Sequence, residues 1–154
     1  MSGKLINQQL STKIKRPAGK TAAQCASEQF PWCSFRYMTT NKDHNLGYLN
    51  RLGARERAQT LHALCGRLEE MTQRKWVYWL QNRKTAGLET IDFGQLTFSP
   101  SETKPTKDTT MYVFRFDTYQ GGGKGRIIGF KEDPCATLQI IGYDFDFSAY
   151  GHGS

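Results

Sequence analysis

The sequence lacks the long apolar segments that membrane and secreted proteins carry. It has no run of about 18 or more apolar residues, which a membrane-spanning helix would need. Its first four residues, Met-Ser-Gly-Lys, are not followed by the apolar core of a secretory signal. We therefore expect no membrane partner and a cytoplasmic location.

Metal and cofactor motifs are also missing. The four cysteines form no C-x-x-C pair, and the three histidines do not fall at the spacing of zinc ligands. The glycine-rich segment around Lys124 is not a Walker motif, because Gly125 follows the lysine where a phosphate loop has Ser or Thr. These absences predict free thiols, no metal and no cofactor, and they give little support to a small-molecule enzyme.

Acidic residues are outnumbered by basic ones. The chain has 21 Lys and Arg against 14 Asp and Glu, a formal net charge of +7. A basic balance favours an anionic partner, of which nucleic acid is the first candidate. The alternative is a basic surface without a specific partner.

Residues 1–29 form a predicted basic, loosely ordered arm. Five of its side chains are Lys or Arg against the single carboxylate of Glu28, and Pro17 interrupts any periodicity. Such an arm is either an electrostatic tether for nucleic-acid phosphates or a solvated tail.

The apolar pattern predicts a single α+β domain over residues 30–154. A chain of 154 residues is long enough for one domain with a core and too short for two of ordinary size. The order of elements favours two helices packed on one face of a mainly antiparallel sheet of four to five strands. The expected strands are residues 32–38, 88–98, 111–119, 124–133 and 136–147, and the expected helices are residues 54–73 and 74–82.

The longer helix is predicted from apolar residues that recur at three- and four-residue steps. These residues form one helical face: Leu61, Leu64, Cys65, Leu68 and Met71. The opposite face is charged: Arg55, Glu56, Arg57, Arg67 and Glu70. We expect the apolar face to be core, and we expect Gly87 to end the second helix.

Strict alternation in residues 112–117 separates aromatic from charged side chains. Tyr112, Phe114 and Phe116 share one face, so Arg115 points away from the helix-covered core if the aromatic side chains point into it. If Arg126 on the next strand lies beside Arg115, the sheet presents two fixed guanidinium groups.

Two opposed like charges are destabilising, so such a pair requires an anion or a carboxylate nearby. A phosphate fits because a guanidinium offers it two parallel hydrogen bonds and keeps its proton near neutral pH. The alternative is an ordinary salt bridge from Arg115 to Asp117 or Asp144.

The C-terminal tail adds Tyr150 and His152. The imidazole of His152 exchanges protons readily near neutrality, although a histidine in a tail is often just exposed. A ribonuclease that uses the 2′-hydroxyl as nucleophile needs a base, an acid and cations around the phosphate. We predict four catalytic residues: Arg115, Arg126, Tyr150 and His152. We predict five further RNA-binding residues: Lys42, Arg83, Lys84, Lys124 and Lys131.

Three segments of residues 30–154 resemble the RelE/YoeB/HigB superfamily of toxin ribonucleases from bacterial toxin–antitoxin systems. They are Phe114-Arg115-Phe116, Gly125-Arg126-Ile127-Ile128-Gly129-Phe130 and Tyr150-Gly151-His152. Residues 35–42 also resemble the opening of bacterial and prophage RelE-like proteins.

The resemblance implies a RelE-like fold and metal-independent cleavage of mRNA, often in the ribosomal A site, with inhibition by a cognate antitoxin. By this resemblance, Arg126 is the strand arginine that contacts the scissile phosphate, and Arg115 is the basic residue of the preceding strand. Tyr150 or His152 is the C-terminal acid or base. No carboxylate base can be matched between the helices and the strands. The alternative is therefore a non-catalytic RelE-like factor of a phage or mobile element that binds RNA, the ribosome or a protein.

Overall fold

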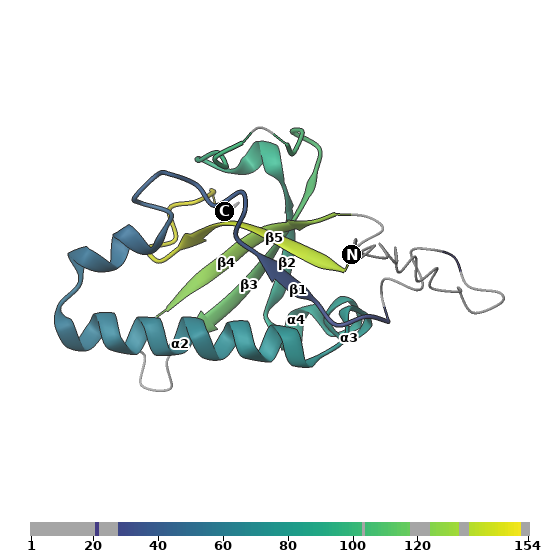
Figure 1. Ribbon diagram of the computed structural model, residues 1–154, viewed down its shortest axis with the longest axis horizontal. Helices are drawn as coiled ribbons and strands as arrows, with labels where there is room; N and C mark the ends of the chain where they lie inside the picture. The colour runs from purple at the N-terminus through teal and green to yellow at the C-terminus, as the bar shows by residue number, and fades with distance from the viewer. Residues whose placement is uncertain (1–20, 22–27, 103, 118–123, 133–135, 152–154) are drawn as a thin grey trace, which may run out of the picture.

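Five strands form one mixed sheet in the order β1-β5-β4-β3-β2 (Figure 1). Three neighbouring pairs run antiparallel, whereas β1 lies parallel to β5. The strands are β1 (Trp32–Ser34), β2 (Leu88–Asp92), β3 (Thr110–Asp117), β4 (Lys124–Lys131) and β5 (Thr137–Asp144). The predicted α+β class is therefore confirmed.

The computed structural model describes residues 21, 28–102, 104–117, 124–132 and 136–151. Most of the predicted basic arm and the glycine-rich hairpin around residues 121–123 lie outside the described residues, as does His152. The division of the chain into an arm and one domain stays a prediction.

The α-helices lie between β1 and β2 in the chain: α2 (Ala54–Gln73), α3 (Trp76–Gln81) and α4 (Arg83–Ala86). The 3-10 helix η1 (Leu46–Arg51) precedes α2, and the 3-10 helix η2 (Phe93–Gln95) follows β2. The predicted bounds of α2 are confirmed. The second predicted helix, residues 74–82, corresponds to α3, and a separate short helix, α4, follows it before Gly87 ends α4 with a φ of 68°. Within the described parts of the chain, no helix is long and apolar enough to cross a membrane.

Several predicted strands are shorter than expected: β5 ends at Asp144 rather than at residue 147, and β1 and β2 are shortened more strongly. β1 stops at Ser34 because only three of its residues pair with β5, and the amide of Met38 then closes a turn by bonding the carbonyl of Phe35 at 3.1 Å. β2 stops at Asp92, whose side chain caps η2, so Gly94 lies in a helical turn rather than in a strand.

The helices cover one face of the sheet (Figure 1). Leu64 and Met71 of α2 and the two tryptophans of α3 pack with Phe114 and neighbouring strand residues in one apolar cluster. The indole N–H groups are bonded, Trp76 to the carbonyl of Ala136 at 2.7 Å and Trp79 to that of Met71 at 3.2 Å.

The predicted faces of α2 are wrong in part. Leu61 and Cys65 are exposed, because the sheet meets α2 along the stripe of Thr60, Leu64 and Met71. Arg67, expected on the charged face, is nearly buried instead. Its guanidinium lies 5.0 Å from the ring of Trp79, donates to the carbonyl of Ala86 and pairs with Glu70.

The other face of the sheet is partly covered by loops. A second apolar cluster joins strand residues with Tyr37, Phe98, Ala149 and Tyr150 from the connecting segments. Backbone hydrogen bonds attach these segments, for example from Thr97 to the carbonyl of Ala149 at 2.8 Å. A bulge between β4 and β5 shifts the register between Ile128 and Gly129.

Candidate functional site

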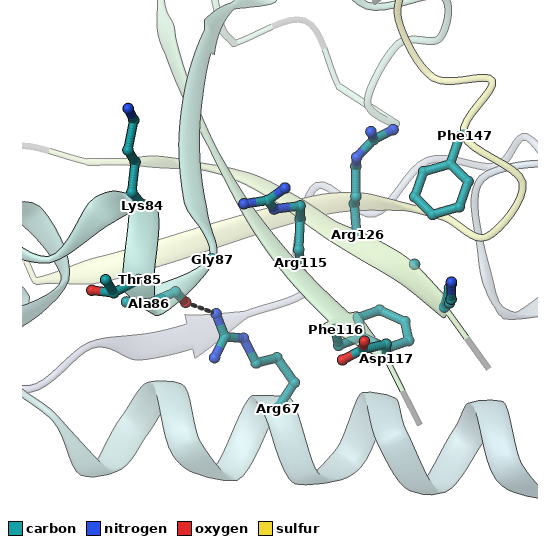
Figure 2. Close-up of a pocket in the computed structure, with 12 residues that line it drawn as sticks. Arg67, Lys84, Thr85, Ala86, Gly87, Arg115, Phe116, Asp117, Arg126 and Phe147 are labelled. Atoms are coloured by element: carbon teal, nitrogen blue, oxygen red, sulfur yellow. Dashed lines mark hydrogen bonds between the residues drawn. The ribbon is translucent and has the colours of Figure 1, made fainter. Parts of the chain in front are cut away.

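Arg115 of β3 and Arg126 of β4 lie directly opposite each other in the sheet. Opposed residues of an antiparallel pair project from the same face, and Figure 2 shows both side chains rising together from neighbouring strands. Phe114 and Phe116 instead join the helix-side cluster. The predicted alternation is confirmed, and both arginines lie on the face that the helices leave open.

The two arginines line a cleft of about 500 Å³. Five basic side chains from four elements surround it, against one carboxylate, that of Asp117. The basic residues are Arg67 of α2, Lys84 of α4, Arg115 of β3, and Lys124 and Arg126 of β4. This concentration of positive charge suits a polyanion.

The cleft continues toward α2. A neighbouring hollow of about 390 Å³ shares Arg67, Arg115, Phe116 and Asp117 with it and extends along the helix to His62. Together the two hollows form a groove that is longer than a single phosphate group requires.

Arg126 is fixed firmly at one end of the cleft. The residue is only 5% exposed, and its Nη1 lies 2.9 Å from Oδ2 of the fully buried Asp144. Its Nε lies 3.5 Å from Oε1 of Glu89. The guanidinium carbon is 4.5 Å from the ring centroid of Phe147 and 4.8 Å from that of Tyr150. These contacts hold one orientation of the planar group.

Arg115 contrasts with Arg126 because it is exposed. Among the residues that the structure describes, neither Asp117 nor Asp144 forms an ion pair with Arg115. The carboxylate of Asp144 forms an ion pair with Arg126 instead. The salt-bridge alternative for Arg115 is thus wrong for both carboxylates, and Arg115 lines the cleft.

Tyr150 is tied to Glu89. Its hydroxyl donates to Oε1 of Glu89. Burial, together with this hydrogen bond to a carboxylate, raises the pKa of Tyr150 well above the ordinary tyrosine value. The phenol therefore stays protonated at neutral pH and is available as a proton donor, although it is a weaker acid than an ordinary tyrosine.

The sequence reasoning missed Glu89, Asp144 as the partner of Arg126, and Phe147. Glu89 shares a face with Val113, its opposite residue on β3, and its side chain is 37% exposed. This carboxylate therefore reaches both solvent and Arg126. Alternation in β2 predicts that Glu89 and Leu88 project from different faces of the sheet. Only the β2–β3 register shows that Glu89 lies near the arginines.

The remaining predicted residues are scattered. Lys84 and Lys124 line the cleft. Lys42 and Arg83 are exposed elsewhere, and the ammonium of Lys131 lies 5.6 Å from the ring of Trp76 at the other end of β4. Their assignment to RNA binding stays a prediction, as does the role of His152.

Among the residues that the structure describes, no cluster of three or more His, Cys, Asp or Glu side chains is arranged to hold a metal ion. Cys33 and Cys65 are free thiols, and burial raises the pKa of Cys33 to about 11.

Comparisons with protein-family models, with curated proteins and with solved structures find no match to this chain. The RelE-like resemblance accordingly stays a prediction. The geometry of the cleft is the basis on which function can be argued.

Proposed function

We propose that this protein is a toxin-like, metal-independent endoribonuclease that binds and cleaves mRNA in the basic cleft. The observation that carries the proposal is the opposed pair of Arg115 and Arg126 beside the accessible carboxylate of Glu89. Two cations for a phosphate thus line the cleft, and a candidate base lies against one of them, Arg126.

Binding follows from the charge of the cleft. The guanidinium of Arg115 is exposed and offers a planar, two-point contact to phosphate oxygens. Lys84 and Lys124 add cations at other points of the cleft wall, where they can hold flanking phosphates. An RNA strand explains both the excess of basic groups and the length of the groove.

Cleavage in this proposal uses the 2′-hydroxyl of the RNA. Glu89 accepts the hydroxyl proton, and the oxygen attacks the adjacent phosphorus. Arg115 and Arg126 stabilise the charge of the five-coordinate phosphorane. The bond to the 5′-oxygen breaks as that oxygen takes a proton from Tyr150 or His152, which leaves a 2′,3′-cyclic phosphate and a 5′-hydroxyl.

The wider setting of the proposal comes from the RelE-like resemblance. It includes cleavage on the ribosome, a cognate antitoxin as partner, and a cytoplasmic role in a bacterium or prophage. None of these elements is needed for the chemistry in the cleft.

A second candidate function is RNA or ribosome binding without cleavage. It is favoured by the burial of Arg126, whose guanidinium already forms ion pairs with Asp144 and Glu89. Buried ion pairs of this kind also occur as purely structural networks. In that case Arg115, Lys84 and Lys124 would bind phosphates and no bond would break.

The test compares wild-type protein with Glu89→Gln and Arg115→Ala on end-labelled single-stranded RNA and on mRNA in a translating extract, with EDTA present. We expect cleavage by the wild type, products with cyclic phosphate ends, and a loss of about 100-fold or more for Glu89→Gln. Glu56→Gln and Arg55→Ala are matched controls, since both residues are exposed on α2.

The outcomes separate the two candidates. Salt-dependent binding with intact RNA, both free and on ribosomes, would favour the non-catalytic function. Tightly controlled expression that leaves growth and mRNA ends unchanged would count against a toxin.

A further inference from the structure

We infer that Phe147 is a stacking platform for one unpaired nucleobase, so that the cleft selects single-stranded RNA. This inference rests on the proposed function, because it requires that the cleft binds RNA. It adds a contact to the base, whereas the arginines and lysines contact phosphates.

The backbone of Phe147 is strained. With a φ of 61° it is the one non-glycine residue with a positive φ among those that the structure describes. A bulky side chain rarely adopts this left-handed conformation, which glycine adopts easily. Such outliers persist where the surrounding structure enforces them, and they concentrate at functional sites.

A compact turn after β5 enforces the conformation. The amide of Ser148 donates to Oδ1 of Asp144 at 2.9 Å and to Oδ1 of Asp146 at 3.2 Å, and the Ser148 hydroxyl also bonds Asp146. Asp144 therefore fixes both the guanidinium of Arg126 and the turn that carries Phe147. The ring and the guanidinium are positioned relative to each other by one buried carboxylate.

The Phe147 ring contacts the guanidinium of Arg126 but lies outside both apolar clusters. Phe147 is 40% exposed, whereas Phe145, two residues earlier, is 9% exposed and joins the helix-side core. Phe147 lines the cleft, and Figure 2 shows its ring beside Arg126. A strained and solvent-exposed aromatic ring next to a basic cleft is arranged for a flat ligand.

A nucleobase fits this ligand because every base has an apolar face that stacks on an aromatic ring. The ring lies close enough to Arg126 to meet the base of the same nucleotide or of its neighbour. A base within a duplex is already stacked, so only an unpaired base can reach the ring. Purines, with the larger stacking area, should bind better than pyrimidines.

The experiment uses the full-length protein and measures binding of short fluorescent single-stranded RNAs by anisotropy. Phe147→Gly and Phe147→Asn both suit a left-handed backbone and remove the ring. We expect their affinity for RNA to fall by about 5- to 150-fold. Phe147→Trp should stay within a few-fold of wild type.

Two further readouts exclude a structural role. The melting temperature of Phe147→Gly should equal or exceed that of wild type, because glycine relieves the strain. An RNA with a single abasic site, moved along the strand, should at one position bind wild type as weakly as it binds Phe147→Gly.

Each contrary outcome has a distinct meaning. Unchanged RNA affinity in both ring-removed variants would overturn the platform while leaving the RNA-binding cleft intact. A lowered melting temperature with equal losses for intact and abasic RNA would make Phe147 a structural cover for Arg126. Wild-type protein that binds no RNA at all would overturn the proposed function together with the inference.

Discussion

The open face of β3 and β4 has two halves that share one backbone geometry and differ in chemistry. In one half, four apolar side chains are buried under the connecting loops: Met111, Val113, Ile128 and Phe130. In the other half, the same alternation continues with Arg115, Asp117, Lys124 and Arg126. The strand geometry is the same in both halves, so the polarity of the side chains decides which half is buried as core.

The two halves also differ in what they contribute to stability. The apolar half stabilises the fold through burial of nonpolar surface. The charged half places two arginines opposite each other and buries one of them, which costs free energy unless carboxylates compensate. Side chains that lower the stability of the folded state are expected at binding sites and catalytic sites.

The largest expected effect comes from breaking the buried pair in the charged half. Asp144→Ala leaves the guanidinium of Arg126 buried without its main partner and should lower the free energy of unfolding by about 3–5 kcal/mol. Urea denaturation measures this change. Asp117→Ala, on the same face but exposed, should change stability by at most about 0.5 kcal/mol. A loss below about 1 kcal/mol for Asp144→Ala would show that solvent reaches Arg126.

A cavity in the apolar half should lower the free energy of unfolding by as much as Asp144→Ala does, or by somewhat less. Ile128 is fully buried, so Ile128→Ala should destabilise the protein by about 2–5 kcal/mol. At temperatures where the variant is folded, its RNA affinity should equal that of wild type, because Ile128 does not line the cleft. Weakened RNA binding by a fully folded Ile128→Ala protein would contradict the separation of the halves.

Removal of the exposed arginine should affect binding and not stability. Arg115→Ala should change the free energy of unfolding by no more than about 0.5 kcal/mol. The slope of log affinity for single-stranded RNA against log salt should become shallower by about 0.7 for the phosphate contact that is lost. Arg55→Ala, which removes the same charge from α2, should keep the wild-type slope.

The smallest expected effect is a change in stability at alkaline pH. The unfolded chain loses the Tyr150 proton near pH 10.0, whereas the folded protein keeps it to higher pH because its pKa is raised. The folded state then binds more protons, so stability is full below pH 10.0 and is lost as pH rises above it. Tyr150→Phe should flatten this decline in urea denaturation between pH 9 and 11.

The pH comparison has an internal reference. Burial also raises the pKa of Tyr143, to about 12, and this residue is present in both proteins. The difference between wild type and Tyr150→Phe therefore reports Tyr150 alone. Parallel pH profiles would mean that the pKa of Tyr150 is not raised in the folded protein, either by burial or by Glu89.

Local sequence patterns predicted the α+β class, the bounds of α2 and the shared face of Arg115 and Arg126. The apolar steps of residues 54–73 and the alternation around Arg115 are properties of single segments, so they could be read without a partner. The pairing of β1 with β5 and of Glu89 with Arg126 joins segments far apart in the chain, and no local pattern encodes such a register. The near-burial of Arg67 was missed for the same reason, since its partners Trp79 and Ala86 belong to other helices.

The bulge in β5 decides which carboxylate Arg126 meets. Leu138 and Ile140 face the helices, and an uninterrupted two-residue period would send Asp144 to that side as well. The extra residue at the bulge changes the phase, so that Tyr143 faces the helices while Asp144 lies opposite Arg126. Without the bulge, the Asp144 carboxylate would lie in the apolar core. With the bulge, it becomes the counter-ion of Arg126.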